Sequence, residues 1–189
     1  MSDNIKVAME YEARSMLSKS QYEDLVSFLS DKPHQDILNK NIYLDTPEIF
    51  LLQHHLMLRI RIINQNQKEL TLKIKESTGD LEINEPFIEE KYNGLKEGKI
   101  LDELVKRDID INRINVVGEL VTERKEYPFD GYLVVLDKNI YNDIIDYNIE
   151  VESISKIEAI NHLNEIGKKF NISYQKDYIS KSRRVVLKH

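Results

Sequence analysis

Five pairs of like-charged residues are the features of this sequence best suited to chemistry. Within each pair the two charges are two residues apart: Glu10 and Glu12, Arg59 and Arg61, Lys73 and Lys75, Glu150 and Glu152, and Lys181 and Arg183. On a β-strand such residues share one face and lie about 6.5–7 Å from each other. Like charges at that separation repel each other unless water or a counter-charge screens them. The pairs are therefore either solvated faces of a sheet or parts of a binding site.

The sign of each pair favours a site for a polyanion. A surface selected only for solubility mixes positive and negative side chains, whereas each of these pairs carries a single sign. Carboxylates bind hard divalent cations, and arginine and lysine bind phosphate oxygens. The pattern indicates a phosphate-rich ligand that is held partly through divalent cations.

The elements that position these charges are predicted to be mainly strands. Polar and apolar residues alternate with the period of a half-buried strand over residues 5–14, 57–63, 69–75, 120–127, 133–138 and 147–153. Turn signals follow several of them: Asn64 to Gln67, Thr78-Gly79-Asp80 and Phe129-Asp130-Gly131. Three segments have the apolar spacing of helices instead, at residues 18–30, 97–107 and 155–170. Ser18 with Gln21, and Ser155 with Glu158, have the spacing of a capping box.

About eight short strands and three helices predict an α+β fold built on a large antiparallel sheet or barrel. A barrel of about eight strands has an interior wide enough for one small ligand. The apolar strand faces would then point outward, and helices would have to cover them. Since no Gly-, Ser- or Pro-rich linker interrupts the chain, a single domain over residues 1–189 is expected.

Composition excludes several classes of protein. The net charge of −6 argues against a nucleic-acid-binding protein, which normally carries a surplus of basic residues. The absence of cysteine excludes disulfides and thiolate chemistry, and no Gly-rich phosphate loop is present. No segment reads as a signal peptide or as a membrane span of about 20 apolar residues, so a cytoplasmic protein without membrane contact is expected.

A series of motifs, in order along the chain, resembles the CYTH family of triphosphate tunnel metalloenzymes, and in particular its bacterial YjbK-like branch. Glu10-Tyr11-Glu12-Ala13-Arg14 resembles the family's N-terminal Glu-x-Glu-x-Lys signature. Further matches extend the resemblance over residues 8–184: Tyr43-Leu44-Asp45-Thr46-Pro47, Leu58-Arg59-Ile60-Arg61, Leu70-Thr71-Leu72-Lys73, Glu82, Thr122-Glu123-Arg124, Leu136-Asp137, Glu150-Val151-Glu152 and Ser180-Lys181.

The resemblance implies an eight-stranded antiparallel tunnel in which a triphosphate is hydrolysed with Mg²⁺ or Mn²⁺. It implies triphosphate binding by Arg14, Arg59, Arg61, Lys73, Lys75, Arg124, Lys181 and Arg183, with Arg184 as the alternative to Arg183. It implies metal binding by Glu10, Glu12, Glu82, Asp137, Glu150 and Glu152. Lys73, Glu12 and Glu152 are the expected catalytic residues, with Lys73 as a partner of the attacking water.

The substrate expected from the resemblance is inorganic tripolyphosphate, a nucleoside triphosphate or thiamine triphosphate. A class IV-type adenylate cyclase, which forms cyclic AMP and pyrophosphate from ATP, is one alternative. A non-catalytic sensor of polyphosphate or nucleotide is a second, and a sheet protein with charged surfaces is a third. The sequence leaves the choice between a monomer and a homodimer open.

Overall fold

The eight strands found within residues 5–187, the part of the chain that the computed structural model describes, form one closed antiparallel barrel. Their order is β1-β5-β4-β3-β2-β6-β7-β8, which confirms the predicted α+β barrel. The described residues fall into two compact units, and β1 (Lys6–Leu17), β2 (Gln35–Asp45) and β6 (Asn115–Phe129) each contribute to both. The expected single domain stays a prediction.

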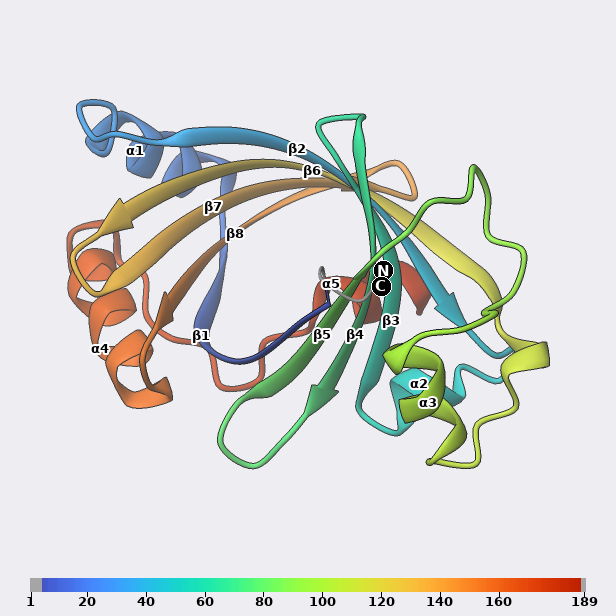
Figure 1. Cartoon of the computed structure of the whole chain (residues 1–189). Coiled ribbons are helices and arrows are strands. Elements are labelled where there is room, and N and C mark those ends of the chain that lie inside the picture. The colour runs from blue at the N-terminus through green and yellow to red at the C-terminus, as the bar shows by residue number, and fades with distance from the viewer. Residues whose placement is uncertain (1–4, 188–189) are drawn as a thin grey trace. The chain divides into compact units, whose positions relative to one another are not determined.

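Unit 1 consists of residues 5–9, 40–120 and 181–187. Its sheet contains β3 (Leu56–Ile63), β4 (Gln67–Lys75) and β5 (Asp80–Pro86), which follow one another as antiparallel neighbours. The apolar residues of these strands pack against α2 (Phe50–Gln53) and α3 (Lys99–Val105), and Figure 1 shows these two helices beside β3. The core of this unit therefore lies on the helix side of the sheet, and the alternate residues face the other way.

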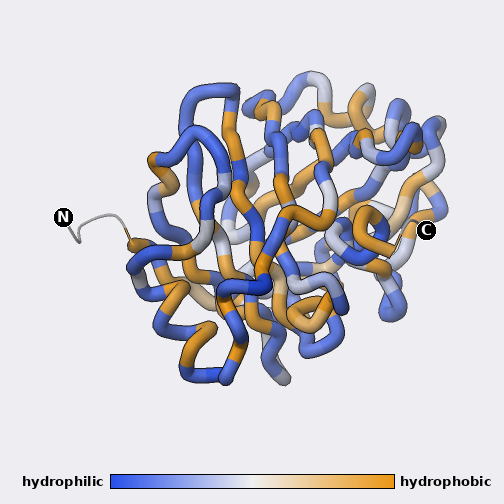
Figure 2. Tube along the Cα trace, turned by 90° about the vertical axis from the view of Figure 1, so that its right-hand side faces the viewer, coloured by the Kyte–Doolittle hydropathy of each residue, from blue (hydrophilic) through white to orange (hydrophobic). Residues whose placement is uncertain are grey.

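Unit 2 consists of residues 10–39 and 121–180. Here β7 (Tyr132–Tyr141) pairs with β8 (Ile144–Ser153), and β8 pairs with β1. The helices α1 (Lys19–Phe28) and α4 (Lys156–Gly167) cover the apolar face of these strands with residues such as Leu25 and Leu163, both fully buried. Figure 2 shows the alternation of hydrophobic and hydrophilic residues along the strands. The expectation that helices cover the apolar strand faces is confirmed within each unit.

The sequence signals located most elements but not all of them. The alternating segments correspond to β1, β3, β4, β6, β7 and β8, and the three helical segments correspond to α1, α3 and α4. The strands β2 and β5 were not predicted, and neither were α2, α5 (Lys181–Val186) and the short 3₁₀ turns η1 (Ile111–Arg113) and η2 (Lys168–Phe170). The short helices and 3₁₀ turns carry too few residues for a clear period. The strand β2 has 11 residues, but its apolar residues come in runs, as in Ile42-Tyr43-Leu44, and so do not alternate with polar ones.

The capping prediction at α4 can be tested by substitution. The Ser155 side chain accepts a hydrogen bond of 3.2 Å from the Glu158 backbone N–H, as expected of an N-cap residue. Loss of such a cap costs about 1 kcal/mol. We expect Ser155→Ala to lower the free energy of unfolding by about 1 kcal/mol in urea titrations followed by circular dichroism. A change below about 0.3 kcal/mol would show that the cap adds nothing here.

Asp45, from the Tyr43-to-Pro47 motif, orders the start of α2. Its carboxylate is buried and accepts three backbone N–H bonds, from Thr46 at 2.7 Å, Leu51 at 2.8 Å and Leu52 at 3.0 Å. The motif therefore has a structural role in unit 1, because one carboxylate satisfies donors that the helix start leaves without partners.

The Asp45 interactions predict a measurable cost for a nearly isosteric change. In Asp45→Asn an amide NH₂ replaces one acceptor oxygen, so at least one of the three N–H groups loses its partner. We expect the free energy of unfolding to fall by about 1–3 kcal/mol. Asp143→Asn, at a turn position, is a control expected to change it by less than about 0.5 kcal/mol.

Within residues 5–187 no helix has both the length and the apolar character needed to cross a membrane. The expected cytoplasmic location stays a prediction.

Candidate functional site

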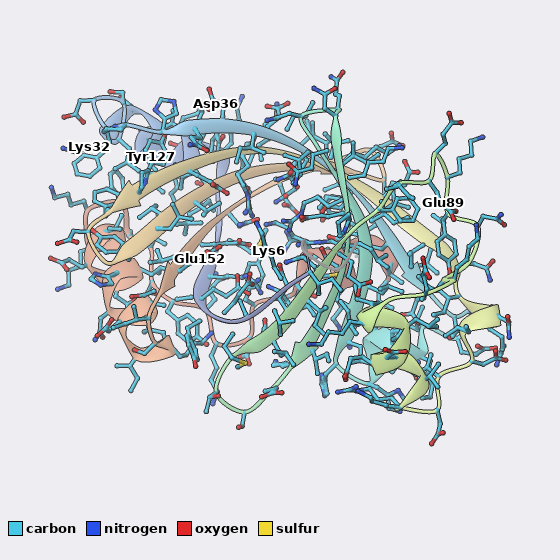
Figure 3. The ribbon with its side chains drawn as sticks, in the orientation of Figure 1. Lys6, Lys32, Asp36, Glu89, Tyr127 and Glu152 are labelled. Carbon is cyan, nitrogen blue, oxygen red and sulfur yellow. The ribbon has the colours of Figure 1, made fainter. Side chains whose placement is uncertain are left out.

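Three carboxylates of unit 2 converge on one point. The pairing of β1 with β8 places Glu12 directly opposite Glu152, and Arg14 directly opposite Glu150. One carboxylate oxygen from each of Glu12, Glu150 and Glu152 lies within 4.8 Å of the others. We call these three residues the acidic cluster, and Glu152 is labelled in Figure 3.

The acidic cluster has the electrostatics of a cation site. The pKa of Glu152 is raised to about 7, first by burial and then by the negative charges of Glu12, Glu150 and Glu10. A carboxyl group in this position resists ionisation because burial disfavours the charged form and because ionisation adds another negative charge to the group. Three carboxylate donors of this kind fit a hard divalent cation, which would relieve the repulsion.

Two arginines, Arg14 and Arg124, form ion pairs with carboxylates of the acidic cluster. Arg14 pairs with Glu12, and its Nε lies 3.3 Å from Glu150 Oε1. Arg124 forms two 2.9 Å bonds to the two oxygens of Asp137 and a third bond of 3.2 Å to Glu150. Burial alone would lower the pKa of Arg124, but Asp137 and Glu150 outweigh it and raise that pKa well above its usual value.

Asp137 and Glu10 were predicted as metal ligands, and the structure places them differently from the acidic cluster. Asp137 is fully buried, and both of its oxygens bond to Arg124. Glu10 lies near enough to raise the pKa of Glu152 but does not belong to the three-carboxylate group. Direct metal binding by either residue stays a prediction.

A second cluster, in unit 1, is dominated by cations. We call Arg59, Arg61 and Lys73 the cationic cluster. Lys73 stands directly opposite Glu82, and its Nζ lies 3.3 Å from Glu82 Oε2, while Arg59 approaches the same oxygen to 3.9 Å. Although burial would raise the pKa of Glu82, Arg59 and Lys73 lower it below its ordinary value.

Arg61 lies two residues beyond Arg59 on the same face of β3. Its guanidinium contacts Glu69 at 3.3 Å and the side-chain oxygen of Asn41 at 3.4 Å. Burial raises the pKa of Glu69, an effect that Arg59 opposes and Glu82 reinforces. The cationic cluster therefore presents three positive side chains in a largely buried setting, which suits the oxygens of a polyphosphate.

The remaining cationic residues that were predicted to bind phosphate are exposed or lie outside the strands. Lys75 is exposed at the end of β4. Lys181 and Arg183 were read as two residues on one strand face, and this reading is wrong, because residues 181–186 form α5. In a helix, residues two apart point about 200° away from each other. Arg184 is buried and Arg183 is exposed. The two-residue spacing between Lys181 and Arg183 is therefore no reason to prefer Arg183 over Arg184 as a phosphate-binding residue.

Several polar residues of these strand faces were not among the predicted site residues. They are Glu69 and Asn84 in unit 1, and Glu126, Asn139 and Asn148 in unit 2. Each lies an even number of residues from a predicted member on its own strand, as Asn148 does from Glu150. The same period-two argument that identified the charges could have found them.

Comparisons with known proteins match most of the length of the chain. A family model described as the CYTH domain matches residues 8–185. The protein named "Putative triphosphatase YjbK" from Bacillus subtilis is 33% identical over 169 residues, which cover 87% of this chain and 87% of that protein.

Solved structures show the same fold. A "putative adenylate cyclase" from Bacillus halodurans is 27% identical with a TM-score of 0.82, covering 94% of this chain and 97% of that one. The "putative adenylyl cyclase HpAC1" from Hippeastrum, described as having a dominant triphosphatase activity, is 22% identical with a TM-score of 0.73. It covers 93% of this chain and 94% of its own, and at that identity the likeness concerns the fold alone.

Proposed function

Because this chain belongs to the CYTH domain family, we propose that it is a triphosphatase that depends on a divalent cation. The proposed substrate is inorganic tripolyphosphate or a small organic triphosphate. The observation that carries the proposal is the convergence of Glu12, Glu150 and Glu152 within 4.8 Å. A relative of 33% identity that is named for the same activity supports it.

The metal is assigned to the acidic cluster, and Mg²⁺ and Mn²⁺ are the proposed ions. When bound, such a cation neutralises developing charge on phosphate oxygens and lowers the pKa of a bound water. Glu12, Glu150 and Glu152 offer the oxygen donors that both ions prefer. Glu10, Glu82 and Asp137 remain proposed as additional or indirect ligands.

The phosphate oxygens are assigned to the cations. Arg59, Arg61 and Lys73 would bind them, with Lys75, Lys181 and either Arg183 or Arg184 as further candidates. Arg124 directs four of its five N–H donors to Asp137, Glu150 and Glu126, so one donor is left for a phosphate oxygen. Arg14 pairs with Glu12 and Glu150 and is proposed to contact phosphate beside these carboxylates.

The proposed reaction is hydrolysis of the terminal phosphoanhydride. Water oxygen attacks the terminal phosphorus, the bond from that phosphorus to the bridging oxygen breaks, and the diphosphate portion of the substrate leaves with the electron pair, while the attacking water loses a proton to solvent. Lys73, whose ammonium lies beside Glu82, is proposed to orient the water and to stabilise the charge that develops. Catalysis of this kind rests mainly on positioning and electrostatic stabilisation.

One assay tests the proposal. Purified protein is incubated with tripolyphosphate, ATP or thiamine triphosphate, in Mg²⁺, in Mn²⁺ or in EDTA, and phosphate, pyrophosphate and cyclic AMP are measured. We expect phosphate release that needs the cation and no cyclic AMP. No turnover of any of the three substrates with either metal would contradict the proposal.

Adenylate cyclase activity is the second candidate, because the Bacillus halodurans structure of 27% identity carries that name. Pyrophosphate together with cyclic AMP from ATP would establish it in the same assay. Tight binding of a triphosphate without any product would instead indicate the non-catalytic sensor.

A further inference from the structure

We propose that Asn148 is a positioning residue for the metal centre, and that a buried chain of hydrogen bonds through Asn139 fixes its orientation. The inference rests on the metal role proposed for Glu150. Asn139 and Asn148 are completely buried, and their proposed role is exercised through the carboxylates that they hold.

The register of unit 2 brings the members of this chain into two adjacent rows. In the first row Thr122 stands opposite Asn139, and Asn139 stands opposite Asp146. In the second row Arg124 stands opposite Asp137, and Asp137 stands opposite Asn148. Both asparagines are completely buried, so each amide must find its partners within the protein.

The contacts join the two rows into one network. The Asn139 side-chain oxygen accepts a 3.0 Å bond from the Thr122 hydroxyl. The Asn139 NH₂ group donates to Asp146 at 2.9 Å and to the Asn148 side-chain oxygen at 2.7 Å. The Asn148 NH₂ group then donates to Asp137 and to Glu150, both at 3.4 Å.

The direction of these bonds is determined at both ends. An ionised carboxylate only accepts hydrogen bonds, so the Asn139 atom that faces Asp146 must be its nitrogen. That nitrogen also faces Asn148, which must therefore present its oxygen to Asn139 and its NH₂ group to Asp137 and Glu150. The requirement that Asp137 and Glu150 accept gives the same orientation independently.

Asn148 differs from a charged residue at this position because its side chain donates hydrogen bonds but is neutral. It donates to two carboxylates without adding charge of either sign, so it orients Glu150 without adding to the positive charge that Arg14 and Arg124 already place beside that carboxylate. Its hold on Asp137 also supports the carboxylate that binds Arg124 through two 2.9 Å bonds. Partners of this kind, one bond away from metal ligands, typically change metal affinity 10- to 100-fold when they are lost.

The test measures Mn²⁺ binding to the full chain without substrate, by electron paramagnetic resonance of free Mn²⁺. We expect Asn148→Leu to weaken binding by about 10- to 100-fold. Thr122→Val, which is nearly isosteric and acts two hydrogen bonds further along the chain, through Asn139 and Asn148, should weaken it by a smaller factor, roughly 3- to 10-fold. Circular dichroism confirms that each variant is folded, and Thr122→Val decides the question if Asn148→Leu does not fold.

Two further variants make the result specific. Thr46→Val removes another buried threonine hydroxyl, which accepts from the Phe50 backbone N–H in unit 1, and should leave the Mn²⁺ dissociation constant unchanged. Glu150→Gln removes a proposed ligand and should weaken binding more than Asn148→Leu does.

The outcomes separate this inference from the proposed function. If the unmodified protein binds no Mn²⁺, or if Glu150→Gln leaves its affinity unchanged, the metal role of Glu150 fails and the inference fails with it. If Glu150→Gln weakens binding while folded Asn148→Leu and Thr122→Val retain the original dissociation constant, the inference alone is overturned. An equal loss in Thr46→Val would also overturn it, since the effect would then follow from any lost buried hydroxyl.

Discussion

Glu152→Gln is expected to lower metal-dependent phosphate release by more than about 100-fold while the protein stays folded. Loss of a residue that merely orients a metal ligand already costs about 10- to 100-fold, and Glu152 is itself a proposed ligand in the acidic cluster. Glutamine keeps the size of the side chain but replaces an anionic oxygen with an NH₂ group, which cannot bind a cation. Glu12→Gln should behave in the same way.

The measurement is the initial rate of phosphate release from tripolyphosphate over a range of Mn²⁺ concentrations. Glu165→Gln, the same chemical change at an exposed position of α4, serves as the control and should retain full activity. Unchanged phosphate release by either Glu152→Gln or Glu12→Gln would refute the assignment of the acidic cluster.

The same substitution should stabilise the metal-free protein at high pH. The folded-state pKa of Glu152 is about 7 against an ordinary value of 4.5, so the fold favours the protonated form. The associated stability is complete below pH 4.5 and is lost as the pH rises through 7. In EDTA at pH 8 we therefore expect Glu152→Gln to unfold with a free energy higher than that of the unmodified protein, by on the order of 1–3 kcal/mol.

Urea titrations at pH 5 and pH 8 measure this difference. At pH 5 most of Glu152 is protonated in the folded state, so the advantage of the glutamine should be much smaller there. An equal effect at both pH values would mean that ionisation of a buried carboxyl group beside other carboxylates is not its cause.

Arg124→Met is expected to lower the free energy of unfolding by about 3–5 kcal/mol. The guanidinium makes two 2.9 Å bonds to Asp137, whose side chain is fully buried, and a further bond to Glu150. Removing one partner of a buried ion pair leaves the other charge in a poorly solvating environment, which is the costly outcome. Methionine keeps most of the length of the side chain, so lost packing contributes little.

Two variants isolate the charge effect. Arg113→Met removes an arginine whose pair with Glu48 is exposed on both sides, and exposed pairs contribute about 0–1 kcal/mol. The double variant Arg124→Met with Asp137→Leu should recover much of the lost stability, because the fully buried charge of Asp137 is removed as well, while Glu150 keeps Arg14 as a partner. A cost for Arg124→Met no larger than that for Arg113→Met would contradict the explanation.

Local patterns were sufficient for much of the fold. Alternation along residues 57–63 and 69–75 identified β3 and β4, and the Ser18 capping box was found at the start of α1 as expected. These signals succeed because strand and helix periods and caps depend on residues only a few positions apart. The signal failed at α5, where Lys181 and Arg183 have the spacing of a strand face in a segment that is helical.

The sequence by itself determined which charges share a strand face, because side chains alternate strictly along a strand. It could thus place Glu150 with Glu152, and Arg59 with Arg61. Only the tertiary structure decided which of them meet across strands, since register depends on the pairing of distant segments. That pairing sets Glu12 opposite Glu152, ties Asp137 to Arg124, and connects Asn139 through Asn148 to Glu150.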